Sequence, residues 1–100
     1  MTFSEAYVYI IKKLESFAEK NNDDNVISIL SDIDCDVWND KKPNDLAAFN
    51  DLKNQLDKYK GENEQFSEEA ALLGLQDFLT IYKENYGFDL ENCLKFLSYK

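Results

Sequence analysis

The chain has 100 residues, 44% of them apolar and 14% aromatic, which is the composition of a single globular domain with one core. Acidic residues outnumber basic residues by 20 to 11, and the net charge is −9. Every basic residue is lysine, so the chain offers no histidine as general base or zinc ligand and no arginine to clamp a phosphate. An acidic chain also repels nucleic acid and anionic lipid. We therefore expect neither an enzyme nor a protein that binds nucleic acid or membranes.

The two cysteines, Cys35 and Cys93, do not form a C-x-x-C pair. The sequence shows no signal peptide and no apolar run of the roughly 18–20 residues that cross a bilayer. We expect a cytoplasmic protein with reduced thiols. A single disulfide is the alternative, because the sequence does not set the distance between the two cysteines.

Two helices are predicted in the first third of the chain. Thr2 and Glu5 have the spacing of a capping box, and the apolar residues that follow fall on one face of a helix over residues 2–20. That face consists of Ala6, Ile10, Leu14, Phe17 and Ala18. The polar run at 21–24 breaks the pattern and offers caps for a second helix over residues 25–33. Its inward face is Val26, Ile29, Leu30 and Ile33.

The third predicted helix covers residues 44–60. Pro43 suits its first turn, where a missing N–H costs little, and Gly61 is expected to cap its end. The apolar stripe of this helix is Leu46, Phe49, Leu52, Leu56 and Tyr59.

Two more helices complete the prediction. Ser67 begins a fourth helix that stops near Gly87, and Asp89 is a good cap for the fifth. No segment alternates polar and apolar residues over the length of a strand. We therefore predict an all-α fold, a single five-helix domain over residues 1–100.

The first helix pair resembles the last pair when the sequence is shifted against itself by 64 residues. The matched positions are Ala6/Ala70, Ile11/Leu75, Leu14/Phe78, Phe17/Ile81, Val26/Leu90, Ile29/Cys93, Leu30/Leu94 and Ile33/Leu97. Two similar helical hairpins are therefore expected to pack around the central third helix, with Cys93 in the core. The alternative is that any two amphipathic helix pairs can be aligned in this way.

An acidic segment, SDIDCDVWNDKKP at residues 31–43, contains the only tryptophan of the chain. An EF-hand loop that began at Asp32 would need glycine where Val37 stands and glutamate where Pro43 stands, so a dedicated calcium switch is not expected, although weak calcium binding stays open. Paired carboxylates can perform acid–base catalysis, but the chain supplies neither a glycine-rich phosphate loop nor a nucleophile beside a base. We assign no catalytic, metal or cofactor site.

The acidic segment is better explained as a docking surface. Eight aspartates and two lysines lie between Asp23 and Asp51, which gives −6 of the net −9. Aspartates also cap helices, and Trp38 could instead fill the core, but the combination is typical of a surface for a basic partner. The predicted partner-binding residues are Asp32, Asp34, Asp36, Trp38, Asp40 and Asp45. If these do not contact the partner, Tyr82 and Tyr86 are the next candidates.

The order of these segments resembles small all-helical immunity proteins of bacterial contact-dependent growth inhibition systems. The resemblance rests on Ser31-Asp32-Ile33, on Asp40-Lys41-Lys42-Pro43, on Asp45 and on Phe49. It departs from the family pattern in two places. Lys41 stands in place of the turn glycine, and Leu52 in place of a second aromatic residue.

The resemblance implies a cytoplasmic antidote, a monomer that forms a 1:1 complex with the C-terminal toxin domain of a delivered effector. In this helical branch the toxin resembles ribonuclease A, and its basic cleft would suit an acidic inhibitor. The main alternative is an acidic helical adaptor or regulator that binds some other basic protein.

Overall fold

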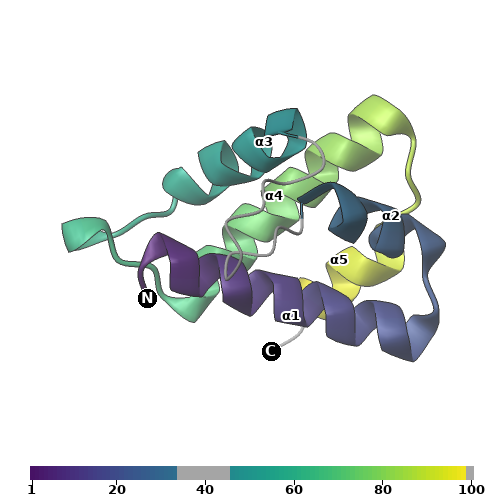
Figure 1. The fold of residues 1–100 in the computed structure, drawn as a ribbon, viewed down its shortest axis with the longest axis horizontal. Coiled ribbons are helices and arrows are strands. Elements are labelled where there is room, and N and C mark those ends of the chain that lie inside the picture. Colours follow the sequence, from purple (N-terminus) through teal and green to yellow (C-terminus); the bar gives the residue numbers. More distant parts are fainter. Residues whose placement is uncertain (34–45, 99–100) are drawn as a thin grey trace.

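The computed structural model describes residues 1–33 and 46–98 and confirms the all-α fold in these ranges (Figure 1). The described residues form five α-helices and one short 3-10 helix. Their bounds are α1 Phe3–Asn21, α2 Asp24–Ile33, α3 Leu46–Asp57, η2 Glu62–Glu64, α4 Glu68–Tyr86 and α5 Glu91–Ser98.

The predicted caps of the two long helices are confirmed. The Thr2 side chain accepts a hydrogen bond from the Glu5 N–H while the Glu5 carboxylate accepts one from the Thr2 N–H, which completes the capping box of α1. Ser67 caps α4 by accepting from the Ala70 N–H. Gly87 ends α4 in the left-handed conformation, at φ 70°, which glycine adopts without steric cost.

The end of the third helix differs from the prediction. α3 stops at Asp57, and Tyr59 donates its backbone N–H to Leu56 in a tight turn. Gly61, which was predicted to cap this helix, lies beyond its end and directly precedes η2, with a φ of −89°. The Tyr59 hydroxyl reaches α4 instead of continuing the α3 stripe. Pro43, the predicted start of this helix, lies outside the described residues.

The two predicted hairpins are present, α1 with α2 and α4 with α5. The third helix, α3, packs against one helix of each hairpin, α4 and α2. α4 is in contact with α1, α3 and α5, and it runs behind the middle of the molecule in Figure 1. The close approach of α3 to α4 depends on Gly74, because a Cβ there would lie 2.9 Å from the Leu56 Cα.

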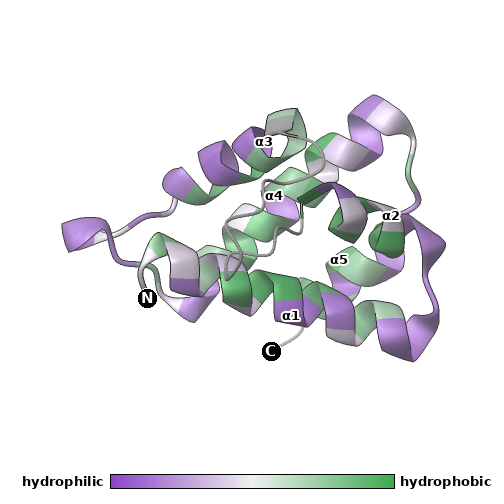
Figure 2. Cartoon of the chain, in the orientation of Figure 1, coloured by the Kyte–Doolittle hydropathy of each residue, from purple (hydrophilic) through white to green (hydrophobic). Residues whose placement is uncertain are grey.

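The core is formed by the inward faces of all five helices. Figure 2 shows hydrophobic positions on the inner sides of the helices and hydrophilic positions at η2 and along α3. Several positions matched by the 64-residue shift have similar burial, since Ile29 and Cys93 are fully buried and Leu30 and Leu94 are both half-buried. The match is not complete, because Ala6 and Phe17 are buried whereas Ala70 and Ile81 are half-buried. Cys93 is a free thiol, and its burial raises its pKa to about 12, so it behaves as a small apolar side chain.

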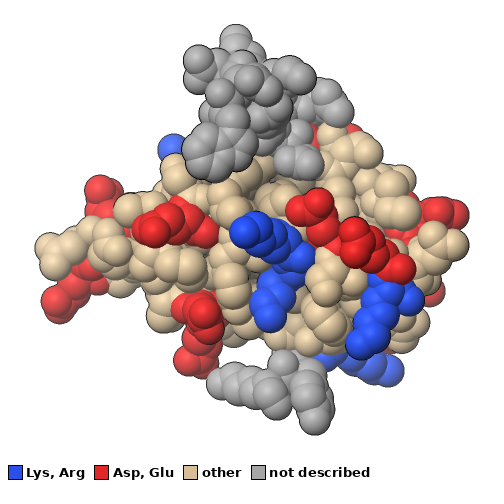
Figure 3. All heavy atoms as spheres, turned by 60° about the horizontal axis from the view of Figure 1, so that its bottom comes forward, with Lys and Arg blue, Asp and Glu red and all other residues tan. Residues whose placement is uncertain are grey.

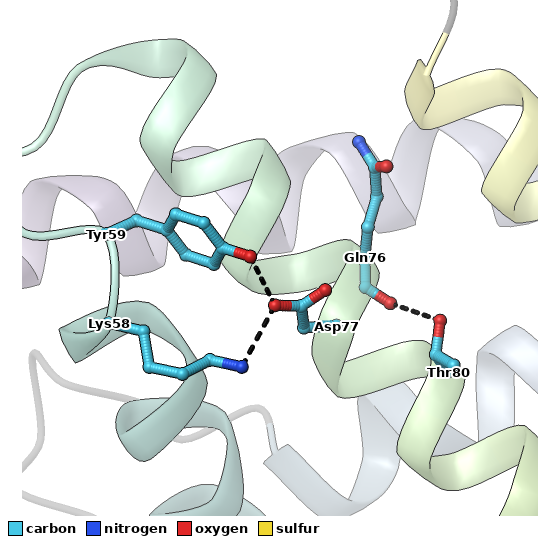
Figure 4. A network of polar contacts seen from close by, with 5 residues as sticks. All are labelled: Lys58, Tyr59, Gln76, Asp77 and Thr80. Atoms are coloured by element: carbon cyan, nitrogen blue, oxygen red, sulfur yellow. Dashed lines mark hydrogen bonds and ion pairs between the residues drawn. The ribbon is translucent and has the colours of Figure 1, made fainter.

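Polar contacts fix the termini of several helices to their neighbours. The Met1 ammonium donates to the Phe66 carbonyl at 2.7 Å, and the Phe66 N–H donates back to the Met1 carbonyl at 2.6 Å. In Figure 4, Tyr59 and Lys58 both point at one carboxylate oxygen of Asp77, with the hydroxyl at 2.5 Å and the ammonium at 3.1 Å. These contacts tie the start of the chain and the turn after α3 to α4.

Candidate partner-binding surface

Asp32 is the one predicted partner-binding residue that the structure describes. It lies in the last turn of α2, where it is half-buried. The other predicted residues lie outside the described residues, in the range 34–45, together with Cys35. They are Asp34, Asp36, Trp38, Asp40 and Asp45.

Two tyrosine hydroxyls fix the last turn of α2. Tyr82 of α4 donates to Asp32 Oδ2 at 3.0 Å, and Tyr7 of α1 donates to the Ile33 carbonyl at 2.6 Å. That carbonyl is one of the four at a helix C-terminus that have no partner within the helix, and its hydrogen bond is buried. The end of α2, where the acidic segment begins, is therefore held by α1 of its own hairpin and by α4 of the other hairpin.

An aromatic cluster at the end of α4 adjoins Asp32. The Tyr82 ring lies 5.0 Å from the Tyr86 ring and 5.5 Å from the Phe88 ring, measured between centroids. Tyr82 is buried, Phe88 is half-buried, and Tyr86 is 64% exposed. The sequence analysis named Tyr82 and Tyr86 as an alternative surface, and the structure brings this surface beside Asp32.

The half-buried carboxylate of Asp32 and the exposed ring of Tyr86 both contact Tyr82, and each is a group that attracts a cationic side chain. The carboxylate supplies the opposite charge, and the face of the ring attracts an ammonium or guanidinium group. Tyrosine is also among the residues that contribute most to the binding energy of protein interfaces. The chemistry of these groups is therefore compatible with a lysine or arginine side chain.

The side of the molecule that carries α1 has a different distribution of charge. Figure 3 shows the side that carries α1, where lysines and carboxylates lie next to one another. No group of three or more metal-binding side chains occurs within residues 1–33 and 46–98, and weak calcium binding by the acidic segment is untested because most of that segment lies outside these ranges.

None of the helices within the described part of the chain combines the length and the apolar character needed to cross a membrane. Comparisons with known proteins identify no relative: no family model matches the chain, and neither the curated proteins nor the solved structures include a significant match.

Proposed function

We propose that this chain is an immunity protein that binds and neutralises a basic toxin domain. The toxin is the C-terminal domain of an effector delivered by contact-dependent growth inhibition, and it is an RNase A-like ribonuclease. The protein acts in the cytoplasm as a monomer that forms a 1:1 complex, and it performs no catalysis itself. The observation that carries the proposal is the concentration of −6 of the net −9 between Asp23 and Asp51.

The proposed mechanism is occlusion of the ribonuclease cleft. A ribonuclease binds the phosphates of RNA with basic side chains, and the carboxylates of Asp32, Asp34, Asp36 and Asp40 take the place of those phosphates. Trp38 is the apolar anchor that packs into the cleft and excludes water. Asp45 adds a further carboxylate for the same partner, and the exposed ring of Tyr86 offers it an aromatic face.

Opposite charges on the two proteins would also give the fast association that an antidote needs. Opposite potentials on two partners can raise association rates to about 10⁸–10⁹ M⁻¹s⁻¹ at low salt. Each carboxylate that is buried in the complex requires a cationic partner to offset its loss of hydration. The basic cleft of a ribonuclease offers such partners in one place.

The test is RNA cleavage by the toxin domain encoded beside this protein, with and without the protein, at 50 mM and 500 mM NaCl. We expect stoichiometric inhibition that weakens as salt increases. If cleavage is not inhibited at either salt concentration, the immunity function is wrong and an acidic helical adaptor becomes the better explanation.

Charge reversal tests which surface is used. Asp34→Lys with Asp36→Lys is expected to weaken inhibition by at least 100-fold, because two like charges would then face the basic cleft. The matched control is Glu15→Lys with Glu19→Lys, which makes the same change in net charge on the exposed side of α1. Equal effects of the two variants would show that only net charge matters, and would contradict a specific acidic face.

A further inference from the structure

A groove between α1, α4 and α5 is lined by positive charge, whereas the chain as a whole is negatively charged. Its volume is about 580 Å³. It is lined by Lys13, Phe17, Lys20, Asn21, Leu72, Asn92, Lys95, Phe96 and Leu97. Acidic residues outnumber lysines by 20 to 11 in the chain, yet three lysines and no acidic residue line this groove.

The floor of the groove is aromatic and well packed. The Phe17 and Phe96 rings lie 5.3 Å apart, and Leu72 extends the apolar surface from α4. Phe17 is buried, whereas Phe96 and Leu72 are half-buried and present part of their surface to the groove. The apolar floor continues toward Leu73 of α4, which is exposed, through a second hollow that shares Leu72 and Leu97.

The three lysines of the rim make no ion pair with a carboxylate in residues 1–33 or 46–98. Lys13 Nζ lies over the Tyr9 ring at 5.4 Å from its centroid, a contact that leaves the ammonium positively charged. Lys20 and Lys95 lie in the last turns of α1 and α5, where the helix dipole favours a cation. The dipole explains two of these positions but not Lys13, which lies in the middle of α1.

The spacing of the lysines indicates a ligand that carries several negative charges. Lys13 and Lys20 are seven residues apart, so they lie on one face of α1 about 10 Å from each other, with Phe17 between them. Lys95 lies across the groove on α5. A ligand with a single carboxylate would leave most of these cations without a partner, whereas a helix with acidic residues about two turns apart would match them.

We propose that this groove binds an acidic amphipathic helix of a protein partner. Apolar side chains of the helix, spaced at three and four residues, pack against Phe17, Leu72 and Phe96, and glutamates that flank them pair with the lysines of the rim. This is the helix-in-groove mode of peptide recognition, with specificity supplied by charge. The site is independent of the toxin-binding surface, because it lies on other residues and attracts the opposite charge.

The probe is a synthetic 15-residue helical peptide with leucine at positions 4, 8 and 11 and glutamate at positions 5, 7, 12 and 14, so that a pair of glutamates two turns apart lies on each side of the leucines. Binding to the full chain is measured by titration calorimetry at 50 mM NaCl. A peptide with lysine in place of each glutamate tests the role of charge, and one with alanine in place of each leucine tests the apolar floor. We expect the first peptide to bind at least tenfold more tightly than either control.

Lys20→Glu with Lys95→Glu is expected to weaken binding of the first peptide at least tenfold. Lys12→Glu with Lys53→Glu changes the net charge by the same amount at exposed positions outside the groove, and should change the affinity less than threefold. Amide chemical shifts that change at Phe17 and Phe96 would place the peptide in the groove. No binding at 1 mM peptide, or equal effects of the two double variants, would overturn the proposal.

Discussion

Asp77 illustrates how single residues tie the helices together. The Tyr59 hydroxyl, helped by the Lys58 ammonium, holds the pKa of Asp77 below its ordinary value of 3.8, although partial burial acts in the opposite direction. The same hydrogen bond raises the pKa of Tyr59, because the phenol must keep its proton to donate it to the Asp77 carboxylate. The contact therefore favours the charged carboxylate and the neutral phenol at pH 7.

This pairing predicts a pH-dependent contribution to stability. The folded state has the lower pKa for Asp77, so the carboxylate stabilises the fold fully above about pH 5, and this contribution is lost as the pH falls through the folded-state pKa. Asp77→Asn should lower the free energy of unfolding at pH 7 by about 0.5–1 kcal/mol, a small value because the side chain is 37% exposed.

The measurement is urea unfolding of both proteins from pH 7 to pH 3, with Asp51→Asn as the control because Asp51 is an exposed aspartate on α3. The difference between wild type and Asp77→Asn should shrink toward pH 3. A difference that stays constant with pH would show that the carboxylate charge is not what stabilises this contact.

At the scale of elements, Gly74 decides how closely α3 and α4 pack. A methyl group at this position would lie 2.7 Å from Leu56 Cδ2 and 2.9 Å from the Leu56 Cα, and the second atom cannot move without the backbone of α3. Alanine normally stabilises a helix by about 1 kcal/mol relative to glycine. At Gly74 overpacking outweighs that gain, because the two helices would have to separate.

We expect Gly74→Ala to lower the stability by about 1–2 kcal/mol, which corresponds to a fall of about 4–16 °C in Tm for a domain of this size. Thermal unfolding followed by circular dichroism measures this shift. Gly61→Ala is the matched control, because its φ of −89° is available to any residue and its added Cβ would meet only the Gln65 carbonyl at 3.3 Å. Equal stability of wild type and Gly74→Ala would contradict the close contact.

The helices were predictable where their signals are local. Thr2 with Glu5, and Ser67 with Gly87, are short patterns that define helix ends by their own hydrogen bonds and backbone conformation. The end of α3 was not predictable, because Tyr59 leaves the helical stripe to bond Asp77, a residue of another helix. The role of Gly74 is likewise visible only once the helix that packs against it is known.

The candidate site also has features that the sequence predicts and features that it does not. The excess of aspartates and the single tryptophan can be read from composition alone, and the excess of negative charge predicts a basic partner. The contact between Asp32 and Tyr82 spans 50 residues of sequence and has no short motif. The lysine-lined groove is hidden because its residues come from three helices whose arrangement the sequence does not give.

At the scale of the whole molecule, the excess of negative charge acts against the compact state. The two ion pairs found within the described ranges are both surface contacts, so attraction between side chains does little to offset the repulsion of a −9 chain. Salt screens charges over about 10 Å at 0.1 M. Added salt should therefore stabilise this protein.

We expect the Tm at pH 7 to rise by about 4–8 °C between 10 mM and 300 mM NaCl, which corresponds to about 1 kcal/mol of relieved repulsion. The control is the same titration at pH 4.3, the isoelectric point of the sequence, where little net repulsion remains to be screened. A fall in Tm with salt at pH 7 would mean that attractive pairs dominate the electrostatics of the fold.

The hydroxyls of Tyr7 and Tyr82 have a further consequence for the proposed complex. Because they fix the last turn of α2 in the free protein, the first carboxylate of the acidic segment loses little conformational entropy when a partner binds. In the proposed complex, affinity then depends partly on two hydrogen bonds within the protein, one of which orients Asp32 itself. Replacing both tyrosines with phenylalanine would leave every interfacial side chain in place and still make the complex weaker.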